Sequence, residues 1–125
     1  MANPNIINAT TILGVTSLTS LTSTSVTSLV SNAASSGKVF KINSIIVANV
    51  DGTAAADITV NIYNNATAGS GSAFAVASTV SVPADATLVV IDKTSAFYLL
   101  ENHSIGAIAS AANDLQVVVS YEEIS

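Results

Sequence analysis

Residues 38–50 read KVFKINSIIVANV, and this stretch decides the fold. Apolar side chains occupy almost every even position, while Lys41, Asn43 and Asn49 are predicted to point the other way. Alternation with a period of two indicates a β-strand with one buried face. The middle, residues 45–47, is apolar on both faces, so we expect another sheet, an arm or a neighbouring subunit to cover the second face.

The residues that follow continue the strand pattern. Asp51 and Gly52 form a dipeptide typical of tight turns. After it, apolar side chains at positions 58, 60 and 62 alternate with polar ones. The alternation predicts a second strand that pairs with residues 38–50 as an antiparallel hairpin.

The rest of the chain shows the same pattern of strands separated by turns. Further strands are predicted over residues 74–82, 88–91, 97–100, 104–109 and 115–124, with a Pro83-Ala84-Asp85 turn after the first of them. Towards the N-terminus, Thr-Ser-Leu recurs at 16–18, 19–21 and 27–29. We interpret this segment as two strands, near 10–17 and 24–31; the alternative is a Ser/Thr linker.

Eight or nine short strands about ten residues apart predict an all-β fold, an antiparallel, jelly-roll-like β-sandwich with almost no helix. Residues 10–125 are expected to form this single domain. Residues 1–9 are predicted to be an extended N-terminal arm, because Pro4 lacks an amide proton and restricts Asn3 before it. Such arms become ordered against a partner.

Composition argues against several classes of partner and chemistry. The chain has 125 residues, of which 50% are hydrophobic and 9% charged, and a net charge of −5. Its three basic residues are all Lys, so no cationic surface for nucleic acid is expected. No apolar run reaches the ~18 residues of a membrane span, and no export signal is expected. The lack of Cys excludes disulfides and thiolate metal sites.

Titratable side chains show no pattern of catalysis. Most of the eight carboxylates lie at turns or strand ends, where they commonly accept local backbone hydrogen bonds. His103 and Ser104 are adjacent, and neighbours on a strand point to opposite faces, so they are not expected to form a nucleophile–base pair. We therefore predict a protein that is not an enzyme and has no catalytic, cofactor or metal site.

The predicted surface favours assembly. Its outward positions are mainly Ser, Thr, Ala and Asn. Removing water from such an uncharged surface costs little free energy. A subunit of a larger homo-oligomeric assembly is therefore expected, rather than a free monomer.

Three segments carry a resemblance to a known family: 37–52 (GKVFKINSIIVANVDG), 80–90 (VSVPADATLVV) and 117–125 (VVVSYEEIS). They resemble small virion structural proteins of marine tailed phages, especially cyanophages with contractile tails. In the wider set of phage β-sandwich proteins, a Val-Pro-Ala turn introduces a Thr-Leu-Val strand. The resemblance covers residues 37–125 and brings no catalytic residues.

What the resemblance implies is a non-enzymatic virion protein, assembled in the host cytoplasm. The most favoured role is a capsid decoration or cement protein that binds the major capsid protein as a homo-oligomer, such as a trimer. The alternative is a neck or tail accessory protein. Such a role is physically reasonable, because an oligomer that attaches to the shell at several points needs only weak individual contacts.

Two sets of residues are candidates for contacts with partners. We predict that the arm residues Asn3, Pro4, Ile6 and Ile7 contact a neighbour, and that Ile45, Val47 and Phe97 contribute to a subunit interface. A carbohydrate-recognition module of a phage fibre is the competing class, since sugar binding uses exposed aromatic rings. Phe40, Phe74 and Tyr121 share the phase of core residues, so Tyr63 and Tyr98 are the candidate platforms.

Overall fold

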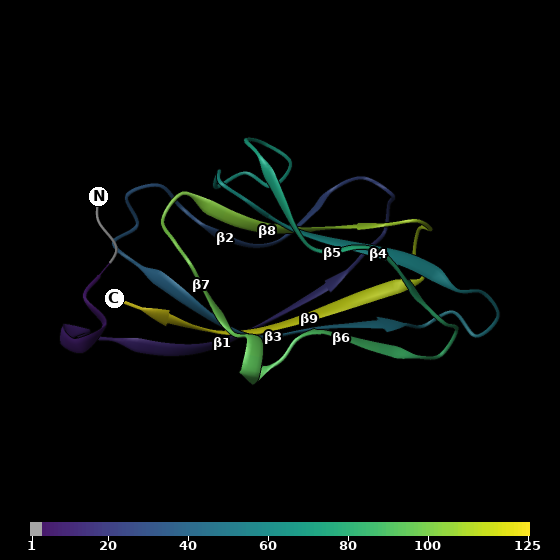
Figure 1. Ribbon diagram of the computed structural model, residues 1–125, viewed down its shortest axis with the longest axis horizontal. Coiled ribbons are helices and arrows are strands. Elements are labelled where there is room, and N and C mark those ends of the chain that lie inside the picture. Colours follow the sequence, from purple (N-terminus) through teal and green to yellow (C-terminus); the bar gives the residue numbers. More distant parts are fainter. Residues whose placement is uncertain (1–3) are drawn as a thin grey trace.

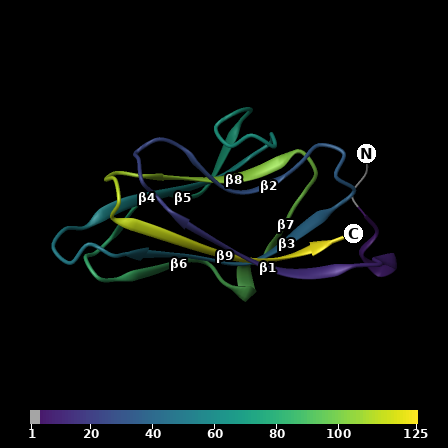
Figure 2. The same ribbon diagram turned by 180° about the vertical axis from the view of Figure 1, so that it is seen from behind.

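The computed structural model describes residues 4–125, which form two stacked antiparallel sheets (Figures 1 and 2). The five-stranded sheet has the order β1-β9-β3-β6, with β7 also paired to β3, and the four-stranded sheet has the order β2-β8-β4-β5. The strands are β1 (Ile12–Ser20), β2 (Thr27–Asn32), β3 (Val39–Asn49), β4 (Ala56–Tyr63), β5 (Ala73–Val82), β6 (Thr87–Ile91), β7 (Phe97–Leu99), β8 (His103–Ala109) and β9 (Leu115–Ile124). Two 3₁₀ turns, η1 (Ile6–Asn8) and η2 (Lys93–Ser95), complete the elements.

The strand pairs are nested, and this nesting defines a jelly roll. β4 pairs with β5, β3 with β6 and β7, β2 with β8, and β1 with β9. The chain is therefore one long antiparallel hairpin whose closing turn joins β4 to β5. The hairpin is rolled so that successive pairs fall alternately in the two sheets. The predicted all-β, jelly-roll-like sandwich is confirmed.

The Thr-Ser-Leu segment forms β1 and β2, as predicted, instead of a linker. β1 runs along β9 over its full length, from Ile12 opposite Ile124 to Ser20 opposite Gln116. β2 lies in the other sheet, beside β8. Leu21 and Leu29, two of the repeated leucines, are buried in the core, which explains why the low-complexity segment folds.

The predicted hairpin between residues 38–50 and 58–63 is wrong. β3 and β4 belong to different sheets, and residues 50–55 carry the chain across the sandwich. Asp51 does form a local turn, because its Oδ1 accepts hydrogen bonds from the backbone N–H and the hydroxyl of Thr53, both at 3.0 Å. Alternation identifies a strand with a buried face but does not identify its partner.

A β-bulge at Asn43 changes which positions of β3 face the core. The register against β9 shifts between Ile42 and Ser44. Before the bulge Phe40 and Ile42 are buried, together with Val39 at the start of the strand, and after it the buried residues are Ile45, Val47 and Asn49. Asn49, predicted to face outward, is therefore buried, and Ile46 takes the outward face.

β5 is an edge strand, and most of it lies outside the core. Phe74, predicted to face the core, is 60% exposed, and only Val82 at the end of the strand is buried. The pairing with β4 shifts twice, and Thr79 has a φ of 46°. These irregularities break the period of two that the sequence pattern implies.

The start of β1 and the end of β9 lie at the same end of the sandwich (Figure 1). The backbone N–H groups of Thr10 and Thr11 donate to the Ser125 carbonyl at 2.8 and 3.0 Å. Before them, η1 is a turn capped by the Asn5 side chain, so residues 6–8 differ from the extended conformation predicted for the arm. Ile7 is 92% exposed.

Candidate interaction surface

The outer face of the four-stranded sheet is partly covered by the chain itself. Residues 64–72 fold back over β8, where the Ser104 hydroxyl donates to the Asn65 carbonyl at 2.7 Å and the Ser31 hydroxyl donates to the Ala66 carbonyl. Figure 1 shows this teal loop above β2 and β8. Gly106 provides the space, because a Cβ there would lie 2.9 Å from the Tyr63 ring and 3.1 Å from Ala68 Cβ.

The outer face of the five-stranded sheet carries four apolar residues in one line across the strands. Leu18 is opposite Val118, Val118 is opposite Ile46, and Ile46 is opposite Val89. Opposite residues in antiparallel strands share a face. We call Leu18, Val118, Ile46 and Val89 the apolar row. Leu18 is 77% exposed and Val89 is 56% exposed, so the row faces solvent at both ends.

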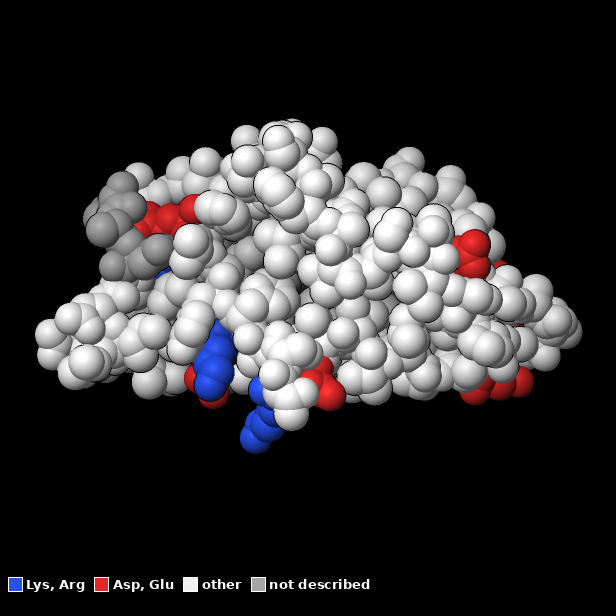
Figure 3. Space-filling model, viewed as in Figure 1, with Lys and Arg blue, Asp and Glu red and all other residues white. Residues whose placement is uncertain are grey.

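Uncharged residues surround the apolar row. The neighbouring outward positions on either side of it are Thr16, Ser120 and Ser44, and Ser20, Gln116, Ala48 and Thr87. An open hollow of about 260 Å³ lies at its β1 end, lined by Leu18, Ser20, Gln116 and Val118 among others. Figure 3, which views the sandwich from the side, shows charged side chains mainly along its lower edge, the side of the five-stranded sheet.

The nearest charges on the same sheet are a cross-strand pair. Lys41 of β3 is opposite Glu122 of β9, and Tyr98 of β7 is opposite Lys41 on its other side. Within residues 4–125, neither the Lys41 ammonium nor the Glu122 carboxylate makes a hydrogen bond or an ion pair. Both groups are therefore available to an external partner.

A second exposed apolar group lies at the end that holds the termini. It consists of Ile6, Ile7, Ile12 and Leu13, each at least 45% exposed. We call it the terminal apolar group. Two of its members, Ile6 and Ile7, belong to the predicted arm, and both are exposed as a contact with a neighbour requires.

The other predicted interface residues have different fates. Ile45 and Val47 are fully buried between the sheets, so they do not form an interface surface, and this prediction is wrong. Phe97 is half-buried against the core, and Pro4 is half-buried beside the termini. Asn3 lies outside the described residues.

The sequence held a partial signal for the apolar row. Val118 breaks the alternation of its strand, and Ile46 belongs to the stretch 45–47 that is apolar on both faces; the structure places the two residues opposite each other. Leu18 and Val89 could be added only once the strand order was known, because they lie on β1 and β6 at the two sides of the sheet.

The exposure of the aromatic candidates for sugar binding differs from the prediction. Tyr63 is 4% exposed, with its hydroxyl accepting a hydrogen bond from Asn61 Nδ2, so it is not a platform. Tyr98 and Phe74 are exposed, but they lie on different sheets. The exposed rings therefore do not form a common surface.

The His103 and Ser104 side chains make separate local contacts. His103 Nδ1 lies 2.7 Å from the Glu101 carbonyl oxygen, while the adjacent Ser104 hydroxyl is bonded to Asn65 on the outer face. The structure thus does not bring His103 and Ser104 together. In the described part of the chain no three His, Asp or Glu side chains gather as a metal site would require, and no helix is long and apolar enough to cross a membrane.

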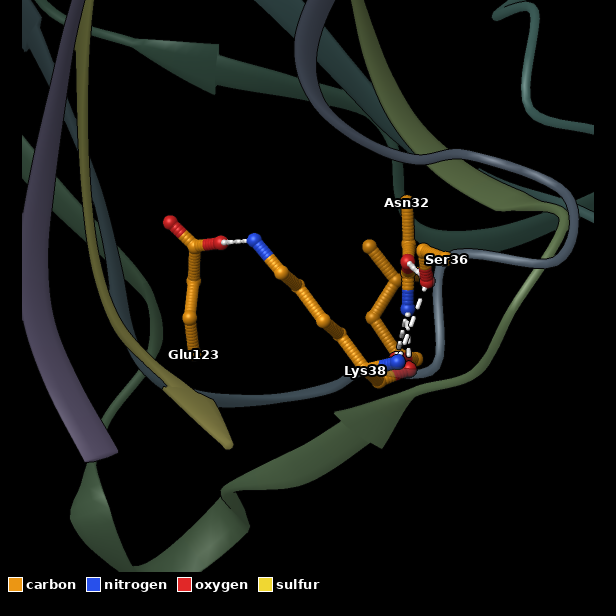
Figure 4. A network of polar contacts seen from close by, with 5 residues as sticks. Asn32, Ser36, Lys38 and Glu123 are labelled. Carbon is orange, nitrogen blue, oxygen red and sulfur yellow. Dashed lines mark hydrogen bonds and ion pairs between the residues drawn. The ribbon is translucent and has the colours of Figure 1, made fainter. Parts of the chain in front are cut away.

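One polar network closes the end of the sandwich near the termini (Figure 4). Lys38 Nζ and Glu123 Oε1 form an ion pair at 3.1 Å, and the buried Asn32 side chain donates to the carbonyl oxygens of Lys38 and Leu99. The Ser36 hydroxyl donates to Asn32 Oδ1. These contacts bind β2 to the start of β3 and to the end of β7, which lie in the other sheet.

Tyr121 lies beside this network, with its ring centroid 5.2 Å from that of Phe40. Burial of the phenol, together with the negative charge of Glu123, raises the pKa of Tyr121 above its ordinary value. The folded state therefore retains the proton longer than the unfolded state does, and folding stability falls as pH rises from the unfolded pKa of about 10 through the folded pKa. We expect Tyr121→Phe to make this alkaline loss of stability shallower, measured by urea unfolding across that pH range. An unchanged slope would contradict the assignment.

The chain was also compared with known proteins. No protein-family model and no curated protein sequence matches it. What is established is therefore the class of fold, a jelly-roll β-sandwich with one uncovered apolar sheet face.

Proposed function

We propose that this protein is a non-enzymatic structural component of a tailed-phage virion, a decoration or cement protein that binds the capsid shell as a homo-oligomer. The observation that carries the proposal is the uncovered outer face of the five-stranded sheet. The chain covers the opposite sheet with its own loop, yet leaves the apolar row exposed and almost free of charge nearby. Exposed apolar surface surrounded by polar residues marks interaction sites.

Two further considerations support a virion role. The resemblance of residues 37–52, 80–90 and 117–125 to phage virion proteins falls on β3, the end of β5, β6 and β9. Three of these strands, β3, β6 and β9, belong to the sheet that carries the apolar row. Jelly rolls also recur in viral capsid proteins and in lectins, an argument from fold analogy alone. The alternative of a carbohydrate-recognition module loses support, because Tyr63, one of its two predicted aromatic platforms, is buried.

The terminal apolar group is the element we assign to contact with the shell. Ile7 extends from a short capped turn, and the chain after this turn is joined to the sandwich by the bonds of Thr10 and Thr11 to Ser125. Burying an apolar side chain of this size contributes about 2 kcal/mol, and many copies on one shell multiply weak contacts.

Deletion of residues 2–9 tests this assignment. We expect the truncated protein to keep its far-ultraviolet circular dichroism spectrum, because none of residues 4–9 is in the core, and to lose binding to shells in co-sedimentation. Retained binding would show that the segment is not the shell contact.

The virion role itself is tested with antibodies against the purified protein. Immunogold labelling of particles from a lysate of the encoding virus is expected to decorate the heads. Labelling confined to the neck or tail would favour the accessory role, and unlabelled particles would overturn the proposal.

A further inference from the structure

We propose that the outer face of the five-stranded sheet binds a second copy of this chain through an isologous interface whose two-fold axis runs along the strands, between β3 and β9. The inference rests on the proposed function, in which subunits associate, and it names the surface and the symmetry of that association.

The position of the axis follows from the strand order. β9 and β3 are the two central strands of β1-β9-β3-β6. A two-fold axis between them places β3 of one subunit over β9 of the other, and β1 over β6. Isologous pairing uses the same patch on both subunits, so the patch must be complementary to itself under this rotation.

The apolar row meets that requirement. Rotation places Ile46 over the partner's Val118, and Leu18 over the partner's Val89. All four contacts across the interface are then apolar, and the two most exposed side chains of the row, Leu18 and Val89, cover each other. On either side, Ser44 lies over the partner's Ser120, Ala48 over the partner's Gln116, and Ser20 over the partner's Thr87. These contacts join hydroxyl, amide and methyl groups.

The charges are complementary under the same rotation. Lys41 of β3 lies over the partner's Glu122 on β9, and Glu122 lies over the partner's Lys41. Each subunit thus supplies one partner to each of two ion pairs, and neither group has another partner among residues 4–125. Aligned sheets cross at about 30°, which the long side chains of Lys and Glu can span at this distance from the centre.

The area is sufficient for a modest dimer. Four strands about 4.8 Å apart and the nine residues of β1 at about 3.3 Å each give a face of about 19 by 30 Å. Two such faces bury about 1,100 Å², which is near the lower limit of a specific interface. We therefore expect dimerisation that depends on concentration.

The first test measures the dissociation constant of the dimer by sedimentation velocity over a wide range of protein concentration. Leu18→Asp places a charge at one end of the apolar row, against the partner's apolar Val89, and is expected to weaken dimerisation at least tenfold. Phe74→Asp is the matched control, because Phe74 is similarly exposed but lies on the four-stranded sheet. Its dissociation constant should equal that of the wild type.

The second test addresses the register. Lys41→Glu and Glu122→Lys should each weaken dimerisation several-fold, because each creates two pairs of like charges. The double variant K41E/E122K restores opposite charges across the axis and should recover the wild-type constant. Asp57→Lys on β4 is the control for charge change on the other sheet. A double variant no tighter than the single ones would overturn the proposed symmetry.

The outcomes separate this inference from the proposed function. A wild-type protein that stays monomeric at every concentration overturns the inference, even where particles are labelled by the antibody. If Leu18→Asp then abolishes labelling, the shell occupies this face. A dimer that responds to the charge exchange supports the inference, even where particles are unlabelled and the virion role fails.

Discussion

Asn49→Ala is expected to lower the free energy of unfolding by about 3 kcal/mol. Asn49 is 2% exposed, and its side chain makes three hydrogen bonds. Nδ2 donates to the carbonyl oxygens of Ala54 and Val82 at 3.0 and 2.9 Å, and Oδ1 accepts from the Asp51 N–H at 2.9 Å. Alanine would leave these backbone groups without their partner, and an unsatisfied buried group costs about 1–3 kcal/mol.

The location of Asn49 explains why the cost is large. It ends β3 in one sheet and bonds to the end of β5 in the other, across the crossing segment of residues 50–55. Asn32 plays the equivalent role at the opposite end of the sandwich, where it joins β2 to β3 and β7. Two buried asparagines therefore hold successive crossings between the sheets.

Chemical denaturation of Asn49→Ala measures the effect, with Asn43→Ala as the matched control. Asn43 lies on the same strand, is half-buried in the bulge, and makes no side-chain hydrogen bond within the described residues. Its replacement should cost less than about 1 kcal/mol. Equal losses for the two variants would show that the Asn49 bonds do not hold the crossing.

Gly106→Ala is expected to destabilise the fold by about 2 kcal/mol. The added Cβ would lie 2.9 Å from Tyr63 Cε2, 3.0 Å from Val26 Cγ1 and 3.1 Å from Ala68 Cβ. All three are closer than ordinary van der Waals contact, and overpacking of this kind costs about 1–3 kcal/mol. The strain should release the loop over β8, so the Ala68 amide is expected to exchange its hydrogen faster.

Gly14→Ala provides the comparison. Gly14 lies in β1, and nothing lies within 4 Å of the Cβ position there. Its replacement should be neutral or stabilising by up to about 1 kcal/mol, because alanine restricts the unfolded chain. Thermal unfolding of the two variants distinguishes a steric cost at Gly106 from a general effect of removing glycine.

The candidate surface was only partly predictable. Val118 stands out in the sequence because it breaks the alternation of its strand, and Ile46 because it lies in the stretch 45–47 that is apolar on both faces. Alternation alone led to Ile45 and Val47 as interface residues, but the bulge at Asn43 turns both into the core. One inserted residue moves every later side chain of the strand to the opposite face of the sheet. The sequence of residues 38–50 contains no local pattern that predicts this bulge.

The strands likewise show that their positions could be predicted from the sequence, whereas their partners could not. Residues 115–124 form β9 with the predicted bounds, because a period of two bounded by turn residues is a local property. The partner of each strand is not local. The Asp51-Gly52 turn suggested a hairpin, whereas the chain crosses to the other sheet and β3 pairs with β6, β7 and β9 instead.

By itself the sequence determined the all-β class, the positions of the strands and the thinly charged surface, because these follow from side-chain period, turn chemistry and composition. Only the tertiary structure decided which strands are neighbours, where the bulge falls, and that Leu18, Val118, Ile46 and Val89 lie in one row. These features depend on contacts between residues far apart in the chain, and such contacts form only when the two sheets pack around a common core.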